Sequence, residues 1–231
     1  MLILVGGVSL RDDRTRAIEL DIIEFSQKKN PKILFIPFAT NIDDGDYGLK
    51  KVIDCYSKIG DFEISQLLYS ELSDIATYQK KIDEADIIYI GGGYTLRLLR
   101  AIRKNGFYSA LLSAIEKKVI VGRSAGALIF FERFLSESIR NSKNVRCYTG
   151  LGYIPNVLGT AHFSEYGEQE LLEKYTLKSG LVGWGMDENT IVIMGSDHEE
   201  QVKYYDTHSK VWIYRKDVSN SKIQISTMGN R

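Results

Sequence analysis

Short apolar runs alternate with helix-like segments through the first half of the chain, and this alternation constrains the fold more than any other feature. The runs resemble strands buried on both faces and occupy residues 2–7, 31–40, 62–69, 86–93 and 119–122. The segments between them carry apolar residues at helical spacing, at residues 14–29, 46–60, 74–85, 95–106 and 108–118. Strands and helices that alternate in this way form right-handed crossovers. We therefore expect an α/β fold with a doubly wound, mostly parallel sheet and helices on both faces.

The pattern changes after residue 180. Short strand-like segments separated by polar turns follow, at residues 180–195, 201–206, 210–217 and 222–226. We expect these segments to form an antiparallel C-terminal extension. No internal repeat, low-complexity tract or linker interrupts the chain, and 231 residues suit one α/β domain. The prediction is therefore a single domain over residues 1–231.

Composition argues against several classes of partner. The chain has 30 Lys and Arg residues against 30 Asp and Glu residues, so its charge gives no basis for binding nucleic acid or an anionic membrane. The N-terminal apolar run lacks the length and basic start of a signal peptide, and no run approaches the ~20 apolar residues of a membrane span. Cys55 and Cys147 show neither metal-ligand nor disulfide spacing. We expect a soluble cytoplasmic protein without metal or cofactor, and the sequence leaves a homodimer open.

A glycine-flanked serine directly follows the last of the apolar runs. The stretch GRSAG (122–126) lies between the strand VIVG and the apolar segment ALIFF, which we expect to be helical. A turn from strand to helix would expose the hydroxyl of Ser124, and the positive end of the helix would favour a developing oxyanion. The alternative is a turn in which the serine only caps the helix. Ser124 is therefore a candidate nucleophile.

A serine nucleophile needs a base, and the chain offers three histidines. His198 and His208 lie in polar turns between short strands, where solvated surface positions are expected. His162 follows an apolar segment and precedes a helix, which is another position at the end of a strand. A core or capping histidine is the alternative there. We predict His162 as the base.

Three carboxylates that follow the elbow could orient this base. Glu132 falls in the helix predicted after Ser124, where a solvated helix face accounts for it. Asp187 and Glu188 lie in a turn that enters an apolar strand, and a polar turn is the simpler explanation for both. The residues alone leave the choice between Asp187 and Glu188 open.

A second glycine loop, IGGGYT (90–95), follows another buried strand. As a phosphate cradle it lacks the third glycine of the dinucleotide fingerprint, since Leu96 stands there, and no Walker lysine follows. The alternative is that its backbone amides face the Ser124 elbow and complete an oxyanion hole.

Four motifs in the order GGGYT, GRSAGA, HFS and GMDENT resemble those of the aspartyl dipeptidase (peptidase E) and cyanophycinase family of serine peptidases. The resemblance covers approximately residues 2–195. It implies a class I glutamine amidotransferase-like fold and a Ser–His–Glu triad, with Ser124 as nucleophile, His162 as base and Glu188 as orienting acid. It also places an oxyanion hole at backbone amides of the glycine loop and the elbow, namely those of Gly92 or Gly93 and Ala125.

The chain departs from this family at two places. Tyr94 stands where the family's glycine loop usually has Asn, and we expect Tyr94 and Arg123 to contact the substrate. Family members tend to carry arginines shortly after the His-Phe pair, whereas this chain has Glu165, Glu168 and Glu170 there and no arginine. We therefore expect no strong preference for aspartate before the scissile bond. Arg123 and Arg97 are the cations that could restore such a preference.

The leading hypothesis is a serine peptidase that hydrolyses small peptides through an acyl-enzyme. A second is a non-catalytic member of the same fold that binds a ligand or partner at this cleft, with Tyr94 occluding the serine. A third, an α/β-hydrolase esterase, fits less well because its acid would lie between Ser124 and the histidine.

Overall fold

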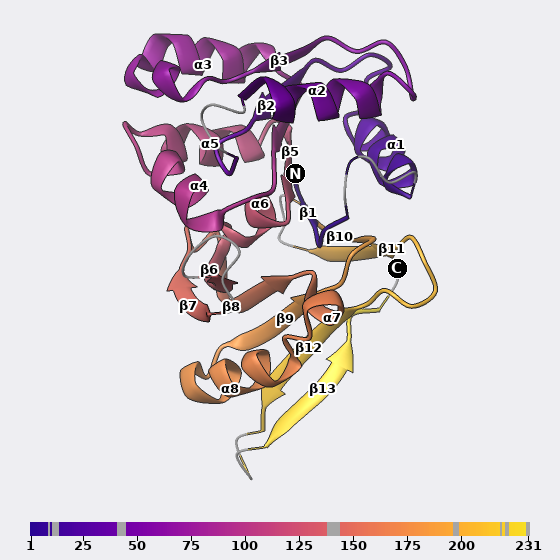
Figure 1. Ribbon diagram of the computed structural model, residues 1–231, viewed down its shortest axis with the longest axis vertical. Coiled ribbons are helices and arrows are strands. Elements are labelled where there is room, and N and C mark those ends of the chain that lie inside the picture. The colour runs from indigo at the N-terminus through magenta and orange to yellow at the C-terminus, as the bar shows by residue number, and fades with distance from the viewer. Residues whose placement is uncertain are drawn as a thin grey trace.

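The computed structural model describes residues 1–8, 10, 14–40, 45–137, 144–195, 199–217, 219 and 222–229, with the backbone alone at 45–47. Within these residues the strands form two sheets, which occupy the upper and lower parts of the molecule in Figure 1. The chain passes between the two sheets at the turn after the serine elbow, between β9 and β10, and between β11 and β12.

The first sheet contains the strands that the alternating pattern predicts. Its order is β11-β10-β1-β5-β4-β2-β3, and β1, β5, β4, β2 and β3 run parallel. The strands β10 and β11 add to its edge in antiparallel pairing. The bounds are β1 Leu2–Val5, β2 Ile33–Ile36, β3 Ile64–Gln66, β4 Ile87–Ile90, β5 Val119–Arg123, β10 Thr190–Met194 and β11 Glu200–Tyr204. The predicted mostly parallel sheet is confirmed.

Helices cover both faces of this sheet, as the alternating pattern requires. Because side chains alternate along a strand, Leu2 and Leu4 pack in one cluster with α3, α4 and α5, while Ile3 and Val5 pack in another with α1 and α2. The bounds are α1 Thr15–Phe25, α2 Gly45–Tyr56, α3 Ile75–Glu84, α4 Thr95–Ile102 and α5 Phe107–Ile115, with a 3₁₀ helix at Tyr69–Ser73.

The second sheet has the order β13-β12-β9-β8-β6-β7. Only β6, β8 and β9 are parallel neighbours in its described part, and the remaining pairs are antiparallel. One face contributes Phe131 and Trp184 to the core shared with the first sheet, and α7 and α8 cover the other face. The bounds are β6 Phe131–Glu137, β7 Val145–Thr149, β8 Ile154–Ala161, β9 Val182–Met186, β12 Val211–Lys216, β13 Ile223–Thr227, α7 Phe163–Tyr166 and α8 Gln169–Ser179.

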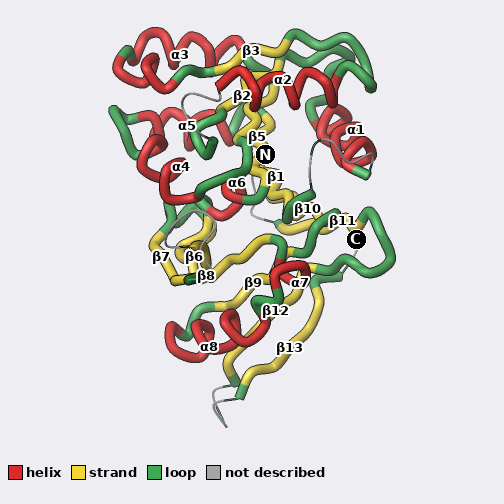
Figure 2. The backbone as a smooth tube through the Cα atoms, viewed as in Figure 1, coloured by secondary structure: helices red, strands yellow, loops and turns green. Residues whose placement is uncertain are grey.

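The predicted helix after the serine is much shorter than expected. The helix α6 spans only Ala125–Leu128, and the chain then enters β6, a change visible in Figure 2. The apolar residues Phe131, Phe134 and Leu135 are spaced as on a helix face, but pairing of β6 with β7 and β8 makes this segment a strand. Glu132 therefore lies on a strand, where its carboxylate accepts a hydrogen bond from the backbone amide of Asn156 at 2.8 Å.

The C-terminal strands are also divided differently from the expectation. Only β10 and β11 extend the first sheet in antiparallel pairing, while β9, β12 and β13 belong to the second sheet, where β9 runs parallel to β8. None of the helices in the described ranges has the length and hydropathy needed to cross a bilayer.

Candidate active site

Ser124 lies at the end of the central strand β5, in a backbone conformation that residues other than glycine rarely adopt. Its φ is 51° and its ψ is −114°, and it is the residue before helix α6. Strain of this kind persists only where the surroundings fix the backbone, and it holds the serine side chain out of the turn. The Ser124 amide donates to the carbonyl of Val5 at 2.9 Å, which ties the turn to β1.

The two glycines that flank the elbow are required by close packing. A Cβ atom at Gly122 would lie 2.3 Å from the carbonyl oxygen of Gly126, and one at Gly126 would lie 2.3 Å from that of Ile90. Backbone atoms cannot move aside as a flexible side chain can. The spacing Gly-x-Ser-x-Gly therefore follows from the contact of the elbow with β4.

His162 lies at the end of β8 in the second sheet, opposite the elbow. Its Nε2 lies 2.9 Å from the Oγ of Ser124, so the hydroxyl can donate to the imidazole. Its amide donates to the carbonyl of Gly6 at 3.0 Å, and a Cβ at Gly7 would lie 2.5 Å from the imidazole ring. The ring of Tyr166, four residues on, stacks on the imidazole with centroids 4.9 Å apart. His162 is therefore held in place by contacts with residues that follow β1 of the first sheet and with Tyr166, which follows β8 of the second sheet.

The turn between β9 and β10 places Glu188, and not Asp187, beside the imidazole. The Oε1 of Glu188 lies 2.6 Å from the Nδ1 of His162. Asp187 is buried and accepts hydrogen bonds from the Ser164 amide and hydroxyl, the Lys210 amide and the Trp212 indole at 2.6–3.0 Å. Asp187 thus joins the start of α7 to β12, whereas Glu188 holds the tautomer of His162 in which Nε2 can accept a proton.

The backbone amides predicted for an oxyanion hole border the same hydroxyl. Gly92 approaches Ser124 so closely that a Cβ there would lie 3.2 Å from the Cβ of the serine. The Tyr94 amide donates to the Ala39 carbonyl at 2.8 Å, which fixes the glycine loop. Among the described residues, the amides of Gly92, Gly93 and Ala125 have no acceptor within the chain. They are available for an oxygen atom of a bound substrate.

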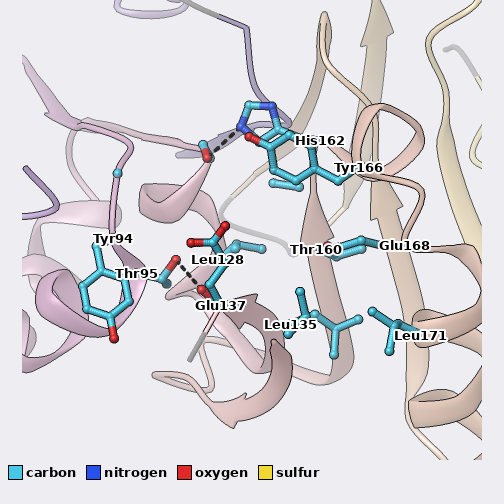
Figure 3. Close-up of a pocket in the computed structure, with 15 residues that line it drawn as sticks. Tyr94, Thr95, Leu128, Leu135, Glu137, Thr160, His162, Tyr166, Glu168 and Leu171 are labelled. Atoms are coloured by element: carbon cyan, nitrogen blue, oxygen red, sulfur yellow. Dashed lines mark hydrogen bonds between the residues drawn. The ribbon is translucent and has the colours of Figure 1, made fainter. Parts of the chain in front are cut away.

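A pocket of about 770 Å³ opens onto Ser124 and His162. Tyr94 and Thr95 form one wall, and residues of the second sheet form the other, as Figure 3 shows. Its lining consists of Gly93, Tyr94, Thr95, Ser124, Leu128, Leu135, Ser136, Glu137, Val145, Thr160, Ala161, His162, Tyr166, Glu168 and Leu171. No group of three His, Cys, Asp or Glu side chains in the described ranges is placed to hold a metal ion.

Arg123 does not line this pocket, although it precedes the serine. Its guanidinium is buried on the other face of β5 and forms an ion pair with Glu19 of α1. It also donates to the hydroxyl of Tyr89 at 2.5 Å and to the carbonyls of Gly7 and Val8. These contacts fix the backbone behind the elbow and the loop beside His162. The structure thus gives Arg123 a supporting position and no access to a substrate in the pocket.

The other residues considered from the sequence have separate places. His208 is exposed in a turn, as predicted, and His198 lies outside the described residues. Arg97 donates to the carbonyl of Thr40 at 2.8 Å. Of the three glutamates after the His-Phe pair, Glu168 lines the pocket, Glu165 accepts from the Glu188 amide at 3.1 Å, and Glu170 is exposed.

Sequence reasoning misses two residues of the site. Tyr166 stacks on His162, and its spacing of four from His162 at the start of a helix is a signal that could identify it. Glu137 lines the pocket from the end of β6, a strand whose apolar spacing resembles that of a helix. No local signal in the sequence marks Glu137, because its position depends on how the second sheet pairs.

Comparison with known proteins agrees with this arrangement. Residues 1–202 match peptidase family S51. The chain belongs to this family. It is 30% identical over 138 residues to the uncharacterized peptidase YgaJ of Bacillus subtilis (strain 168), a match covering 58% of this chain and 56% of that protein. It is 24% identical over 164 residues to peptidase E of Salmonella arizonae, covering 67% of this chain and 69% of that protein.

A solved structure extends the likeness in fold over nearly the whole chain. The crystal structure of a peptidase from an acI-B1 Actinobacterium superposes with a TM-score of 0.69 at 21% identity, covering 99% of this chain and 94% of that one. At this identity the match shows the fold alone. The chain spans about half the length of the first curated relatives that it matches, at 56%, 48% and 48%. The resemblance inferred from the four motifs is confirmed at the level of the family.

Proposed function

We propose that this S51 family member is a serine peptidase that hydrolyses small peptides through Ser124, His162 and Glu188. The observation that carries the proposal is the continuous hydrogen-bonded chain from the Ser124 hydroxyl through both imidazole nitrogens to Glu188, at 2.9 and 2.6 Å. A nucleophile, a base and an orienting acid in this order are the parts that acyl transfer needs. The pocket of about 770 Å³ has room for a small peptide.

In the proposed reaction the Oγ of Ser124 attacks the scissile carbonyl carbon while Nε2 of His162 takes the hydroxyl proton. Glu188 accepts a hydrogen bond from Nδ1 and stabilises the imidazolium that forms. Amides of Gly92 or Gly93 and of Ala125 donate to the carbonyl oxygen as it becomes negative. His162 then gives its proton to the leaving amine. Water, deprotonated by His162, attacks the acyl-enzyme and releases the acid.

The pocket also bears on the two rival hypotheses. A pocket of this size open to Ser124 supports catalysis over occlusion by Tyr94, whose ring lies on the wall in Figure 3. The orienting acid follows the histidine in the chain, which supports a peptidase of this family over an α/β-hydrolase esterase. No lysine or arginine of the described residues lines the pocket, so we expect aspartate before the scissile bond to give no advantage.

The test is turnover of a dipeptide panel by wild-type protein and by Ser124→Ala. Loss of the nucleophile should lower kcat by on the order of 10⁶, because nothing else in the site can form the acyl-enzyme. Ser113→Ala, at an exposed position of α5, is the control and should keep wild-type turnover. A folded Ser124→Ala variant with activity within tenfold of wild type would refute the proposal.

A further inference from the structure

The wall of the pocket contributed by the second sheet is acidic. Glu137 at the end of β6 and Glu168 just before α8 both line it, and no lysine or arginine does so in the described part of the chain. Figure 3 shows Glu137 within the pocket, with its carboxylate oxygens between the glycine-loop wall and the wall that carries Thr160 and Glu168. A substrate that reaches Ser124 passes these carboxylates.

Glu168 is buried without a cation. Its side chain belongs to a residue only 7% exposed, and its carboxylate accepts a hydrogen bond from the hydroxyl of Thr160. No lysine or arginine of the described residues lies within ion-pair distance of it. A buried carboxylate is costly unless a positive charge compensates it, and one hydroxyl supplies only part of that compensation.

The charges around Glu168 show the same lack of a compensating positive charge. Burial raises the pKa of Glu168, and the neighbouring Glu137 carboxylate raises it further against the lowering effect of the Thr160 hydroxyl. Tyr166, which also lines this pocket, likewise has a raised pKa through burial and the charges of Glu188, Glu137 and Glu168. Every charged side chain near Glu168 in the described wall is therefore acidic, and a bound cation would relieve the repulsion.

The position of Glu168 suits a side chain close to the scissile bond. Its partner Thr160 precedes His162 by two residues at the end of β8, a separation of about 6.5 Å along a strand. A flexible side chain of lysine or arginine attached next to the scissile carbonyl spans such a distance with its charged end. A free α-ammonium group one residue further along a peptide is the other cation that could arrive there.

We propose that Glu168, assisted by Glu137, binds a cationic group on the acyl side of the substrate, so that the enzyme selects small peptides with a positive charge next to the scissile carbonyl. This inference rests on the proposed function, because the pocket is taken as the substrate site of Ser124. It predicts that this protein prefers cationic peptides as substrates over acidic ones.

The test uses reversible boronic acids that add to the Oγ of Ser124 and compete with its labelling by a fluorophosphonate. N-acetyl boronic acids with the lysine and the norleucine side chain differ only in the charged amine. At pH 8 the lysine compound should protect Ser124 at a concentration roughly ten- to a hundredfold lower, the effect of one charge-assisted hydrogen bond. Replacing the acetyl group of the norleucine compound by glycyl places a free α-ammonium group one residue further along and tests it as the source of the charge.

Variants assign the effect to its residue. Glu168→Gln keeps an acceptor for Thr160 and should bring the lysine and norleucine compounds to within about threefold of each other. Glu170→Gln, an exposed neighbour on α8, should keep the wild-type ratio. An advantage of the glycyl norleucine compound alone would assign the site to the α-ammonium group.

The inference is overturned if neither charge improves protection of the wild-type protein, or if Glu168→Gln keeps the preference. In both cases normal labelling of Ser124 would leave the proposed function standing. Absence of labelling would refute the proposed function, and the inference with it.

Discussion

The two sheets contribute to the site in different ways. The first sheet supplies Ser124, the proposed nucleophile, and the candidate oxyanion amides, and these are positioned by backbone contacts such as those of Gly122 and Gly126. The second sheet supplies His162, Tyr166 and the acidic wall, which are positioned by side-chain contacts. Glu188 comes from the turn that joins them. Under the proposed function, reactivity would depend on the junction between the sheets, and substrate choice mainly on the second sheet.

Removing the base tests the junction and should have the largest effect. His162→Ala leaves the Ser124 hydroxyl without a proton acceptor, so we expect kcat to fall by about 10⁵–10⁶. His208→Ala, an exposed position in a turn, should keep wild-type kcat. Steady-state kinetics on one dipeptide substrate measures both, and equal losses in the two variants would contradict the assignment of the base.

Substitutions of the adjacent carboxylates Asp187 and Glu188 should affect different properties, stability for Asp187 and catalysis for Glu188. Glu188→Gln disturbs the tautomer of His162 and should lower kcat by about 10⁴ with little change in Tm. Asp187→Asn replaces one carboxylate oxygen by an amide nitrogen, so two of its four part-buried donor groups lose their acceptor, and it should instead lower stability by about 1–3 kcal/mol. Kinetics and thermal melts on both variants would contradict this division if Asp187→Asn were folded as stably as wild type and had the larger loss of kcat.

The backbone positioning of the first sheet predicts a cost for a single methyl group. In Gly126→Ala the new Cβ would lie 2.3 Å from the carbonyl oxygen of Ile90, so β4 and the elbow have to separate. We expect a loss of about 3 kcal/mol in the free energy of unfolding, together with loss of activity. Gly229→Ala has open space around its Cβ and serves as the control in the same denaturant titration. Unchanged stability of Gly126→Ala would contradict the account of the elbow.

The acidic wall of the second sheet predicts the smallest effect. Substitution of Glu168 there should raise stability, whereas the substitutions above lower activity or stability. Burial and Glu137 raise the folded-state pKa of Glu168 above its ordinary value, which is about 4.3 in an unfolded chain. The folded state therefore binds this proton more tightly, and stability falls as pH rises through the raised pKa. Tyr166 and Thr160 face the same carboxyl from α7 and β8, and neither supplies a positive charge.

Glu168→Gln should remove this pH-dependent loss. At pH 7 to 8 its Tm should equal or exceed that of wild type, and the difference should close as pH is lowered towards 4. Glu170→Gln should follow wild type throughout. A Tm of Glu168→Gln well below wild type at neutral pH would mean that the carboxylate stabilises the fold. That result would contradict the proposal that Glu168 is a substrate-binding group whose charge is uncompensated in the free protein.

The first sheet is predictable from the sequence because its strands are buried on both faces and are separated by helices with regular spacing. For the same reason the sequence alone places Ser124 and the glycine loop at strand ends. His162 is placed at a strand end by the apolar segment before it, which forms β8 of the second sheet. The strand Phe131–Glu137 cannot be recognised in this way, since Phe131, Phe134 and Leu135 also fit one face of a helix. This ambiguity conceals β6, and with it the place of Glu137 in the pocket.

Arg123, Asp187 and Glu188 show further limits of local reasoning. The position of Arg123 beside the nucleophile predicts contact with a substrate, but Glu19 of a distant helix pairs with it on the opposite face of β5. Asp187 and Glu188 cannot be told apart from their positions in the chain. Their roles follow from which one faces β12 and which one faces β8, and those neighbours are set by the pairing of the second sheet.

The most direct test of the central claim is covalent labelling at the junction of the two sheets. The protein is incubated with a fluorophosphonate and its intact mass is measured, followed by peptide mapping. The account predicts a single adduct on Ser124 in wild type, no adduct in Ser124→Ala, and strongly slowed labelling in His162→Ala because the hydroxyl then lacks its base. Absence of an adduct on folded wild-type protein, or labelling that is unchanged in Ser124→Ala, would contradict it.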